Sequence, residues 1–155
     1  NSAWSGLSTD GYCWYNNNEN TYKNIYGALY NWYTVNTGKL CPANWHVPSD
    51  EEWTELIDNL GGNTVAGGKL KETGTSHWIS PNTGATNESG FTALPGGHRN
   101  SDGTFADIGY YGNWWTSTAS STFNSYHRWL ENISAKSYRS TPGNRWGFSI
   151  RCVKD

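Results

Sequence analysis

The chain has 155 residues, enough for one domain with one core, and its 13 acidic and 11 basic side chains give a net charge of −2. It has no basic run, and nucleic acid requires clustered lysine and arginine to neutralise phosphates, so that partner is disfavoured. The apolar runs are too short to span a bilayer, which argues against direct membrane insertion.

Aromatic side chains stand in for aliphatic ones in this sequence. The chain holds 10 tryptophans and 10 tyrosines although only 35% of its residues are hydrophobic, and each large aromatic side chain buries roughly 150–250 Å². We therefore expect most tryptophans in the core, in particular Trp32, Trp45, Trp53 and Trp114. The 18 glycines and the low charged content indicate many turns.

Two helices are expected in the N-terminal half. After a short strand and loop in residues 1–20, apolar residues between Tyr22 and Val35 recur at helical spacing and predict the first helix. A short strand at 45–47 follows. The second helix begins at Ser49, whose pairing with Glu52 forms a capping box. Gly61-Gly62 ends it, and its buried stripe consists of Trp53, Leu56, Ile57 and Leu60.

After residue 62 the pattern changes to short aromatic and β-branched pieces separated by glycine and proline. The two strongest strands are expected at Tyr126–Ile133 and Phe148–Val153. Two helices followed by a run of strands predict an α+β fold.

Several motifs resemble those of the Fibrobacter succinogenes major paralogous domain. They are Tyr26-Gly-Ala-Leu-Tyr-Asn-Trp32, Leu40-Cys-Pro-Ala-Asn-Trp-His-Val-Pro-Ser-Asp-Glu-Glu-Trp53, Gly90-Phe-Thr-Ala-Leu-Pro-Gly-Gly97, Trp114-Trp-Thr-Ser-Thr118 and Gly147-Phe-Ser-Ile-Arg-Cys-Val153. The resemblance runs from about Tyr12 to the C-terminus. That family in turn resembles the formylglycine-generating-enzyme branch of the C-type-lectin-like fold.

The resemblance implies a single C-type-lectin-like domain over residues 1–155. Two N-terminal helices would pack on short, twisted, mainly antiparallel sheets, with the N- and C-terminal strands close together. It also implies an extracytoplasmic setting, secreted or at the cell surface of a bacterium, often within a larger protein or lipoprotein. The chain starts at Asn1 and holds no methionine, so we expect a processed or excised piece of a longer surface protein with other domains.

Formylglycine-generating enzymes use a reactive cysteine pair late in the chain. This sequence has no cysteine between Cys41 and Cys152, so neither those residues nor their copper chemistry carries over. We expect no enzyme and no cofactor. The alternative is a carbohydrate-active enzyme with an unrecognised site, for which nothing singles out Asp102, Asp107 or Glu131.

The three cysteines leave at least one thiol unpaired within the chain. A Cys41–Cys152 disulfide would close a loop of roughly 110 residues and stabilise the fold by up to about 5 kcal/mol. Cys13 is an alternative partner, and buried reduced thiols are another possibility. Of the histidines, His46 is expected to make structural hydrogen bonds and His98 to lie in a surface turn.

Residues in the strand at 126–133 alternate between two faces. By resemblance to the family, Tyr126, Arg128 and Leu130 face the scaffold. The opposite face would then present His127, Trp129 and Glu131, and the neighbouring Asn132, Asn144, Arg145 and Trp146 would join them in binding a ligand. Aromatic area with a few polar groups is typical of recognition sites, which predicts an adhesin-like module for glycan or protein.

Two further expectations concern the loops. The related fold often binds structural calcium, and Asn87-Glu88 and the segment 102–107 supply suitable oxygens. Some relatives are diversified by retroelements, and the matching stretch here would be 118–147. It is rich in residues that adenine-directed mutation of asparagine codons gives, but Trp129, Glu131, Lys136 and Trp146 cannot arise that way.

Overall fold

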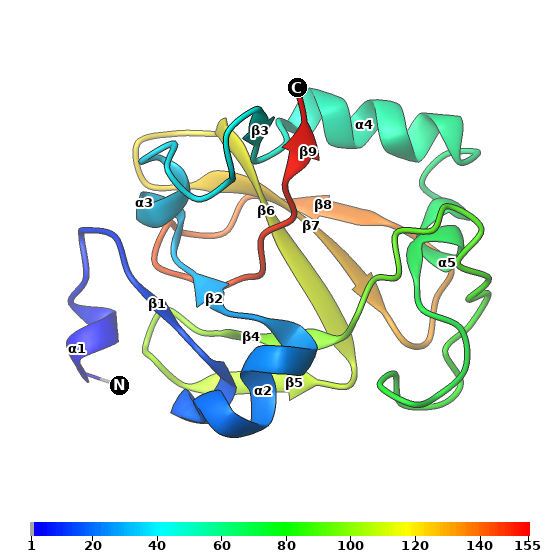
Figure 1. Ribbon diagram of the computed structural model, residues 1–155, viewed down its shortest axis with the longest axis horizontal. Coiled ribbons are helices and arrows are strands. Elements are labelled where there is room, and N and C mark those ends of the chain that lie inside the picture. Colours follow the sequence, from blue (N-terminus) through cyan, green and yellow to red (C-terminus); the bar gives the residue numbers. More distant parts are fainter. Residues whose placement is uncertain (1) are drawn as a thin grey trace.

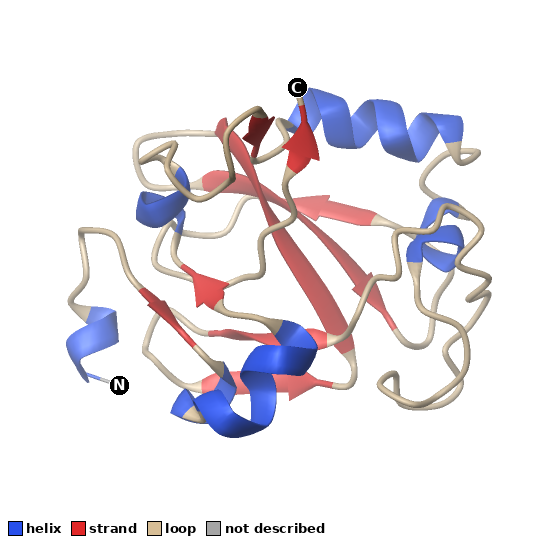
Figure 2. Ribbon diagram, viewed as in Figure 1, coloured by secondary structure: helices blue, strands red, loops and turns tan. Residues whose placement is uncertain are grey.

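The computed structural model describes residues 2–155, and it has short helices arranged around small antiparallel sheets (Figures 1 and 2). The predicted α+β class is therefore confirmed. The helices are α1 (Ser2–Ser5), the 3₁₀ turn η1 (Tyr15–Asn17), α2 (Glu19–Tyr26), α3 (Trp32–Val35), α4 (Asp50–Asn59) and α5 (Ala66–Leu70). The strands are β1 (Tyr12–Cys13), β2 (Leu29–Tyr30), β3 (Trp45–His46), β4 (Gly96–Arg99), β5 (Phe105–Ile108), β6 (Tyr111–Ala119), β7 (Ser125–Glu131), β8 (Tyr138–Ser140) and β9 (Val153–Lys154).

The largest sheet has three strands in the order β6-β7-β8, and β6 and β7 cross the centre of the molecule in Figure 1. The hairpin register sets Asn113 opposite Trp129 and Trp115 opposite His127. On the other side of β7, Tyr138 pairs with Trp129. The remaining sheets each have two strands, β1-β2, β3-β9 and β4-β5.

The C-terminal segment connects these small sheets. Phe148 bridges Tyr30, Gly147 bridges Arg99, and Ser149 bridges Trp114. The last strand, β9, pairs with β3, whereas the first strand, β1, pairs with β2. The two terminal strands therefore do not pair with each other, and the C-terminal segment meets the N-terminal half at β2 and β3 instead.

Of the cysteine arrangements left open by the sequence, the Cys41–Cys152 disulfide is present and joins residues 111 positions apart, with Cα atoms 5.9 Å apart. It links the C-terminal segment to the loop before β3. Cys13 is buried and unpaired by any disulfide in the described chain, and burial raises the pKa of its thiol.

The single helix predicted between Tyr22 and Val35 is wrong. The helix α2 ends at Gly27, which takes a positive φ of 72° and donates its N–H to the Lys23 carbonyl. A new cap then starts α3, since the Asn31 side chain accepts from the Thr34 N–H at 3.1 Å. The apolar spacing continued across this break, but the pairing of β2 with β1 overrides it.

The second predicted helix is confirmed as α4. Ser49 Oγ accepts from the Glu52 N–H at 3.1 Å and the Glu52 carboxylate accepts from the Ser49 N–H at 2.8 Å, which completes the capping box. Trp53 and Ile57 are buried, and the partly buried Leu56 and Leu60 pack against the same cluster. The helix stops before Gly61 and Gly62, both at positive φ.

Tryptophans fill the core, as expected. Trp32, Trp53 and Trp114 are each at most 7% exposed, but Trp45 is 44% exposed, so its predicted core position is wrong. The reason is that β3 is a two-residue strand paired with β9 at the edge of the molecule near the C-terminus (Figure 1). The neighbouring His46 makes the expected structural hydrogen bonds, to Asp155 at 2.6 Å and Glu52 at 2.8 Å.

A buried ionic cluster attaches α4 to the sheet. The Asp50 carboxylate accepts from Arg128 Nε at 3.1 Å and Nη2 at 2.8 Å, and from Arg139 Nε at 2.8 Å. Arg128 also donates to the Asp50 carbonyl at 3.0 Å and to Thr54 Oγ1 at 2.7 Å. Asp50 and Arg128 are almost fully buried, whereas the Arg139 side chain is 46% exposed.

A second buried cation fixes the loops beside α5. Lys71 is fully buried, and its Nζ donates to the carbonyls of Thr83, Glu131 and Ser134 at 2.9–3.0 Å. These three bonds use every donor of the ammonium group. Burial lowers the pKa of Lys71 to about 8.

Candidate ligand-binding site

The two faces of β7 differ as the sequence predicted. On one face Arg128 binds Asp50 of α4, and Leu130 packs in the cluster that contains Trp53. On the other face His127 and Trp129 line an open hollow of about 310 Å³. We call this space the aromatic hollow; its lining residues are His98, Asp107, Tyr111, Asn113, His127, Trp129, Ser140, Pro142, Trp146 and Phe148.

One wall of the aromatic hollow is a set of stacked rings. Trp129 lies flat on Tyr138, with ring centroids 3.9 Å apart and planes 8° from parallel. Tyr111 contacts the same indole at 5.5 Å. Because β6 and β8 flank Trp129 on both sides in the sheet, its ring is held in a fixed orientation.

The other wall and the floor come from the C-terminal segment and β4. The partly buried Trp146 packs against His98 at 5.2 Å. On the floor, His127 stacks on Phe148 at 4.5 Å with an interplanar angle of 13°. Two of the predicted site residues, Trp129 and Trp146, therefore border one space although they come from different segments.

Polar atoms on the floor have hydrogen-bonding capacity to spare. The Asn113 amide donates to the Gly97 carbonyl at 3.2 Å, but no described residue donates to its Oδ1. His127 Nδ1 lies 3.2 Å from Ser140 Oγ, and no described residue bonds its Nε2. These two atoms can bond a ligand that enters the hollow.

The hollow carries negative charge at neutral pH. Burial lowers the pKa of His127 to about 4 and also lowers the pKa of His98, so both rings are neutral there. Asp107 is partly exposed at the rim, and its carboxylate lies 3.8 Å from His98 Nδ1. The pKa of Tyr111 is raised, mainly by burial and to a smaller extent by the negative charges of Glu131 and Asp107. None of the lysines or arginines within residues 2–155 lines the hollow.

Four of the predicted site residues lie outside this hollow. Glu131 accepts a bond from the Tyr138 hydroxyl at 2.5 Å, and the buried Asn132 donates to the carbonyls of Ile79 and Ser80. The buried Asn144 accepts from Ser125 Oγ at 2.8 Å. Arg145 is exposed elsewhere and donates to the Leu7 carbonyl at 3.1 Å. The first three serve to fix loops, because their polar atoms are used inside the chain.

Sequence reasoning missed the partners that the sheet register supplies. Asn113 and Tyr111 enter the hollow from β6, and Ser140 enters from β8. His98, expected in a surface turn, lies on β4 with a side chain only 13% exposed. The alternation of side chains in residues 111–115 could have indicated which of them share a face. It could not have shown which strand pairs with this one.

The two loops considered for calcium do not gather their carboxylates. The Asn87 side chain binds Thr92, Glu88 faces Lys69 at 3.5 Å, and Asp102 is bonded by Thr104. Within residues 2–155, no three His, Cys, Asp or Glu side chains form a metal-binding group. A structural calcium ion stays a prediction.

These features define a small, disulfide-linked α+β domain with an open hollow lined by aromatic side chains. A family model described as the Fibrobacter succinogenes major domain matches residues 3–154, so the chain belongs to that family. A search of curated proteins found no match, and neither did a search of solved structures. None of the helices in residues 2–155 is long and apolar enough to cross a membrane.

Proposed function

We propose that this domain is a non-catalytic, adhesin-like module that binds a neutral glycan in the aromatic hollow. The observation that carries the proposal is the fixed Trp129 ring, stacked on Tyr138 and facing a space bordered by Trp146. A sugar ring presents an apolar face that can stack on an indole, and its hydroxyls can bond Asn113 Oδ1 and His127 Nε2.

Charge favours a neutral glycan over an acidic one. Asp107 lines the hollow, Glu131 lies close enough to act on Tyr111, and no basic side chain lines the space. A uronic acid or sulfated sugar would bring like charge to these carboxylates, which costs affinity. A protein ligand is the alternative, and it would have to insert an apolar or cationic side chain.

The setting that we propose is secreted or at the surface of a bacterium, within a longer chain whose other domains are further partners. The Cys41–Cys152 disulfide supports an oxidising compartment, because such bonds are rare where thiols are kept reduced. We also propose that the fold is C-type-lectin-like, which the connection of the C-terminal segment to β2 and β3 supports.

The test is binding of the isolated domain to arrays of glycans and host proteins, followed by Trp129→Ala and Trp146→Ala. We expect both variants to keep the fold and to lose at least about tenfold in affinity, the usual cost of removing an aromatic anchor. Trp45→Ala is the matched control, because Trp45 is exposed and outside the hollow. Normal binding by both hollow variants would contradict the proposal.

Two other outcomes have defined meanings. Hydrolysis of an arrayed polysaccharide would favour the carbohydrate-active enzyme. Variation of positions 127, 129, 140 and 146 among near-repeats of the gene, next to a reverse transcriptase, would favour the retroelement-diversified receptor. All four positions line the hollow and fall within 118–147.

A further inference from the structure

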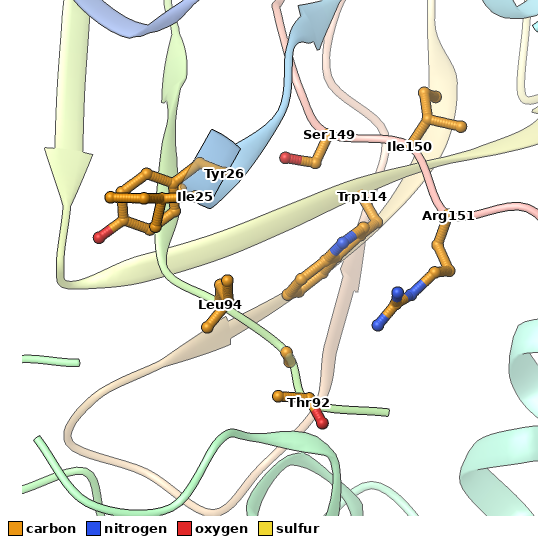
Figure 3. A pocket seen from close by; sticks show the side chains of 10 residues that line it. Ile25, Tyr26, Thr92, Leu94, Trp114, Ser149, Ile150 and Arg151 are labelled. Atoms are coloured by element: carbon orange, nitrogen blue, oxygen red, sulfur yellow. The ribbon is translucent and has the colours of Figure 1, made fainter. Parts of the chain in front are cut away.

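A second, smaller pocket shares no lining residue with the aromatic hollow. It occupies about 150 Å³ between α2, the loop before β4, β6 and the C-terminal segment (Figure 3). We call it the Arg151 pocket; its lining residues are Ile25, Tyr26, Thr92, Ala93, Leu94, Gly96, Trp114, Ser149, Ile150 and Arg151.

The pocket contains a cation without an ionic partner. Arg151 lies over the Phe91 ring, with the guanidinium carbon 4.4 Å from the centroid, and Nη2 donates to the Phe91 carbonyl. No carboxylate of the described residues pairs with it. Several guanidinium N–H groups therefore stay available, in the planar fork that matches a carboxylate.

A buried indole adds a second unpaired donor. Trp114 is only 6% exposed, yet none of the described residues accepts a hydrogen bond from its Nε1, and the ring lines the pocket. Figure 3 shows the indole in the middle of the pocket, with Arg151 on one side and Ile25 and Tyr26 on the other. The ring is held in place by close packing, since a Cβ added at Gly112 would come within 2.4 Å of it.

Ser149 supplies a third donor. Its backbone is fixed, because its N–H bonds the Asn113 carbonyl at 3.1 Å and its carbonyl accepts from Trp115 N–H at 3.2 Å. The Ser149 hydroxyl has no hydrogen-bonding partner among residues 2–155, and Figure 3 shows it pointing toward the Tyr26 side of the pocket, with the Trp114 indole between it and Arg151. A guanidinium, an indole N–H and a hydroxyl thus border one space, and none of the described acidic residues lines it.

We propose that the Arg151 pocket binds a carboxylate attached to a short apolar group. The Arg151 guanidinium and the Trp114 indole N–H match the oxygens of a carboxylate, and a charge-assisted bond to arginine is the strongest contact available. The apolar body would pack against Leu94, Ile150 and Tyr26. At about 30 Å³ per water molecule, the pocket holds about five waters, which fits a small acid or one terminal residue of a peptide.

Nitrogen-15 NMR of the whole domain tests this site with propionate as the probe and propionamide as the neutral control. We expect propionate to cause saturable shifts of the Trp114 indole N–H and the Arg151 Nε–H, and propionamide to cause none. Shifts that are absent, or equal for the two probes, would overturn the proposal. Inorganic phosphate binding where propionate does not would overturn it as well.

Variants assign the effect to the named residues. Arg151→Gln should weaken propionate binding by about tenfold or more, because it removes the charged donor. Ser149→Ala should weaken it less and leave the packing intact, which keeps the test informative if Arg151→Gln is unstable. Arg145→Gln, an exposed arginine outside the pocket, is the control and should not change the affinity. Unchanged affinity in both pocket variants would refute the assignment.

The source of the carboxylate is resolved by three further probes. They are a tripeptide with a free C-terminus, the same peptide amidated, and a hexuronic acid. Tighter binding of the free peptide than of propionate, lost on amidation, would identify a peptide terminus. Tighter binding of the hexuronic acid would identify an acidic sugar, and either result supports the site.

Discussion

Asp50→Asn is expected to be among the most damaging single substitutions that keep side-chain size. The Asp50 carboxylate is 6% exposed and accepts bonds from both Arg128 and Arg139. In the variant, Arg128 stays buried, and its Thr54 and Asp50 carbonyl contacts supply no negative charge. Breaking a buried pair in this way costs about 3–5 kcal/mol of unfolding free energy.

The size of this effect follows from burial, which two controls can show. Glu51→Gln changes a neighbouring acid in the same first turn of α4, but Glu51 is exposed, so we expect a loss below about 1 kcal/mol from the helix dipole. Arg139→Ala removes the exposed partner of the same carboxylate and should also cost no more than about 1 kcal/mol.

Urea denaturation followed by circular dichroism measures the free energy of unfolding of all three variants. In a thermal scan of a chain of this length, a loss of about 3–5 kcal/mol corresponds to a fall in Tm of roughly 6–20 °C. If Asp50→Asn matched Glu51→Gln within experimental error, the buried cluster would not be what holds α4 on the sheet.

Three further predictions concern two other buried side chains and the disulfide. Lys71→Met should cost about 3 kcal/mol or more because it leaves three carbonyls without their donor, while Lys69→Met, at a more exposed lysine, should be nearly neutral by urea denaturation. Cys152→Ser should cost about 2–5 kcal/mol, and dithiothreitol should reduce the wild type to the same stability; a wild type unaffected by reduction would argue against the bond. The pKa of His127 in the folded protein is about 4, below its value in the unfolded chain. The unfolded chain therefore binds a proton at a higher pH than the folded protein does. As a result, the free energy of unfolding falls by about 3 kcal/mol as pH drops from 6.5 to 4. His127→Phe should flatten that part of the curve, with a residual slope from His98; an unchanged slope would mean that another group causes it.

Some parts of this domain could be predicted from short stretches of sequence. The helix α4 was predictable because its capping box, apolar stripe and terminal glycines lie within 14 consecutive residues, 49–62. The division of β7 into a scaffold face and a presented face followed from strand alternation together with the family pattern. The Cys41–Cys152 bond was one of several pairings that three cysteines allow, so the sequence offered it as an alternative.

The tertiary structure decided which of those residues share a space. Glu131, Asn132 and Asn144 are close in sequence to the predicted binding residues. Their polar atoms are already hydrogen-bonded to residues of other segments of the chain. The break at Gly27 had the same cause, since pairing of β2 with β1 competes with continued helix. Trp45 was assigned to the core by composition alone, which cannot say that its strand lies at an edge.

The sequence by itself determined the family, the α+β class, and the tryptophans that could border a site. Only the tertiary structure decided that Trp129 and Trp146 border one hollow and that Trp114, Ser149 and Arg151 border another. The physical reason is that hydrogen-bond satisfaction is a property of contacts between distant segments. A residue type shows which bonds a side chain can make, but the fold shows which of them are still unmade.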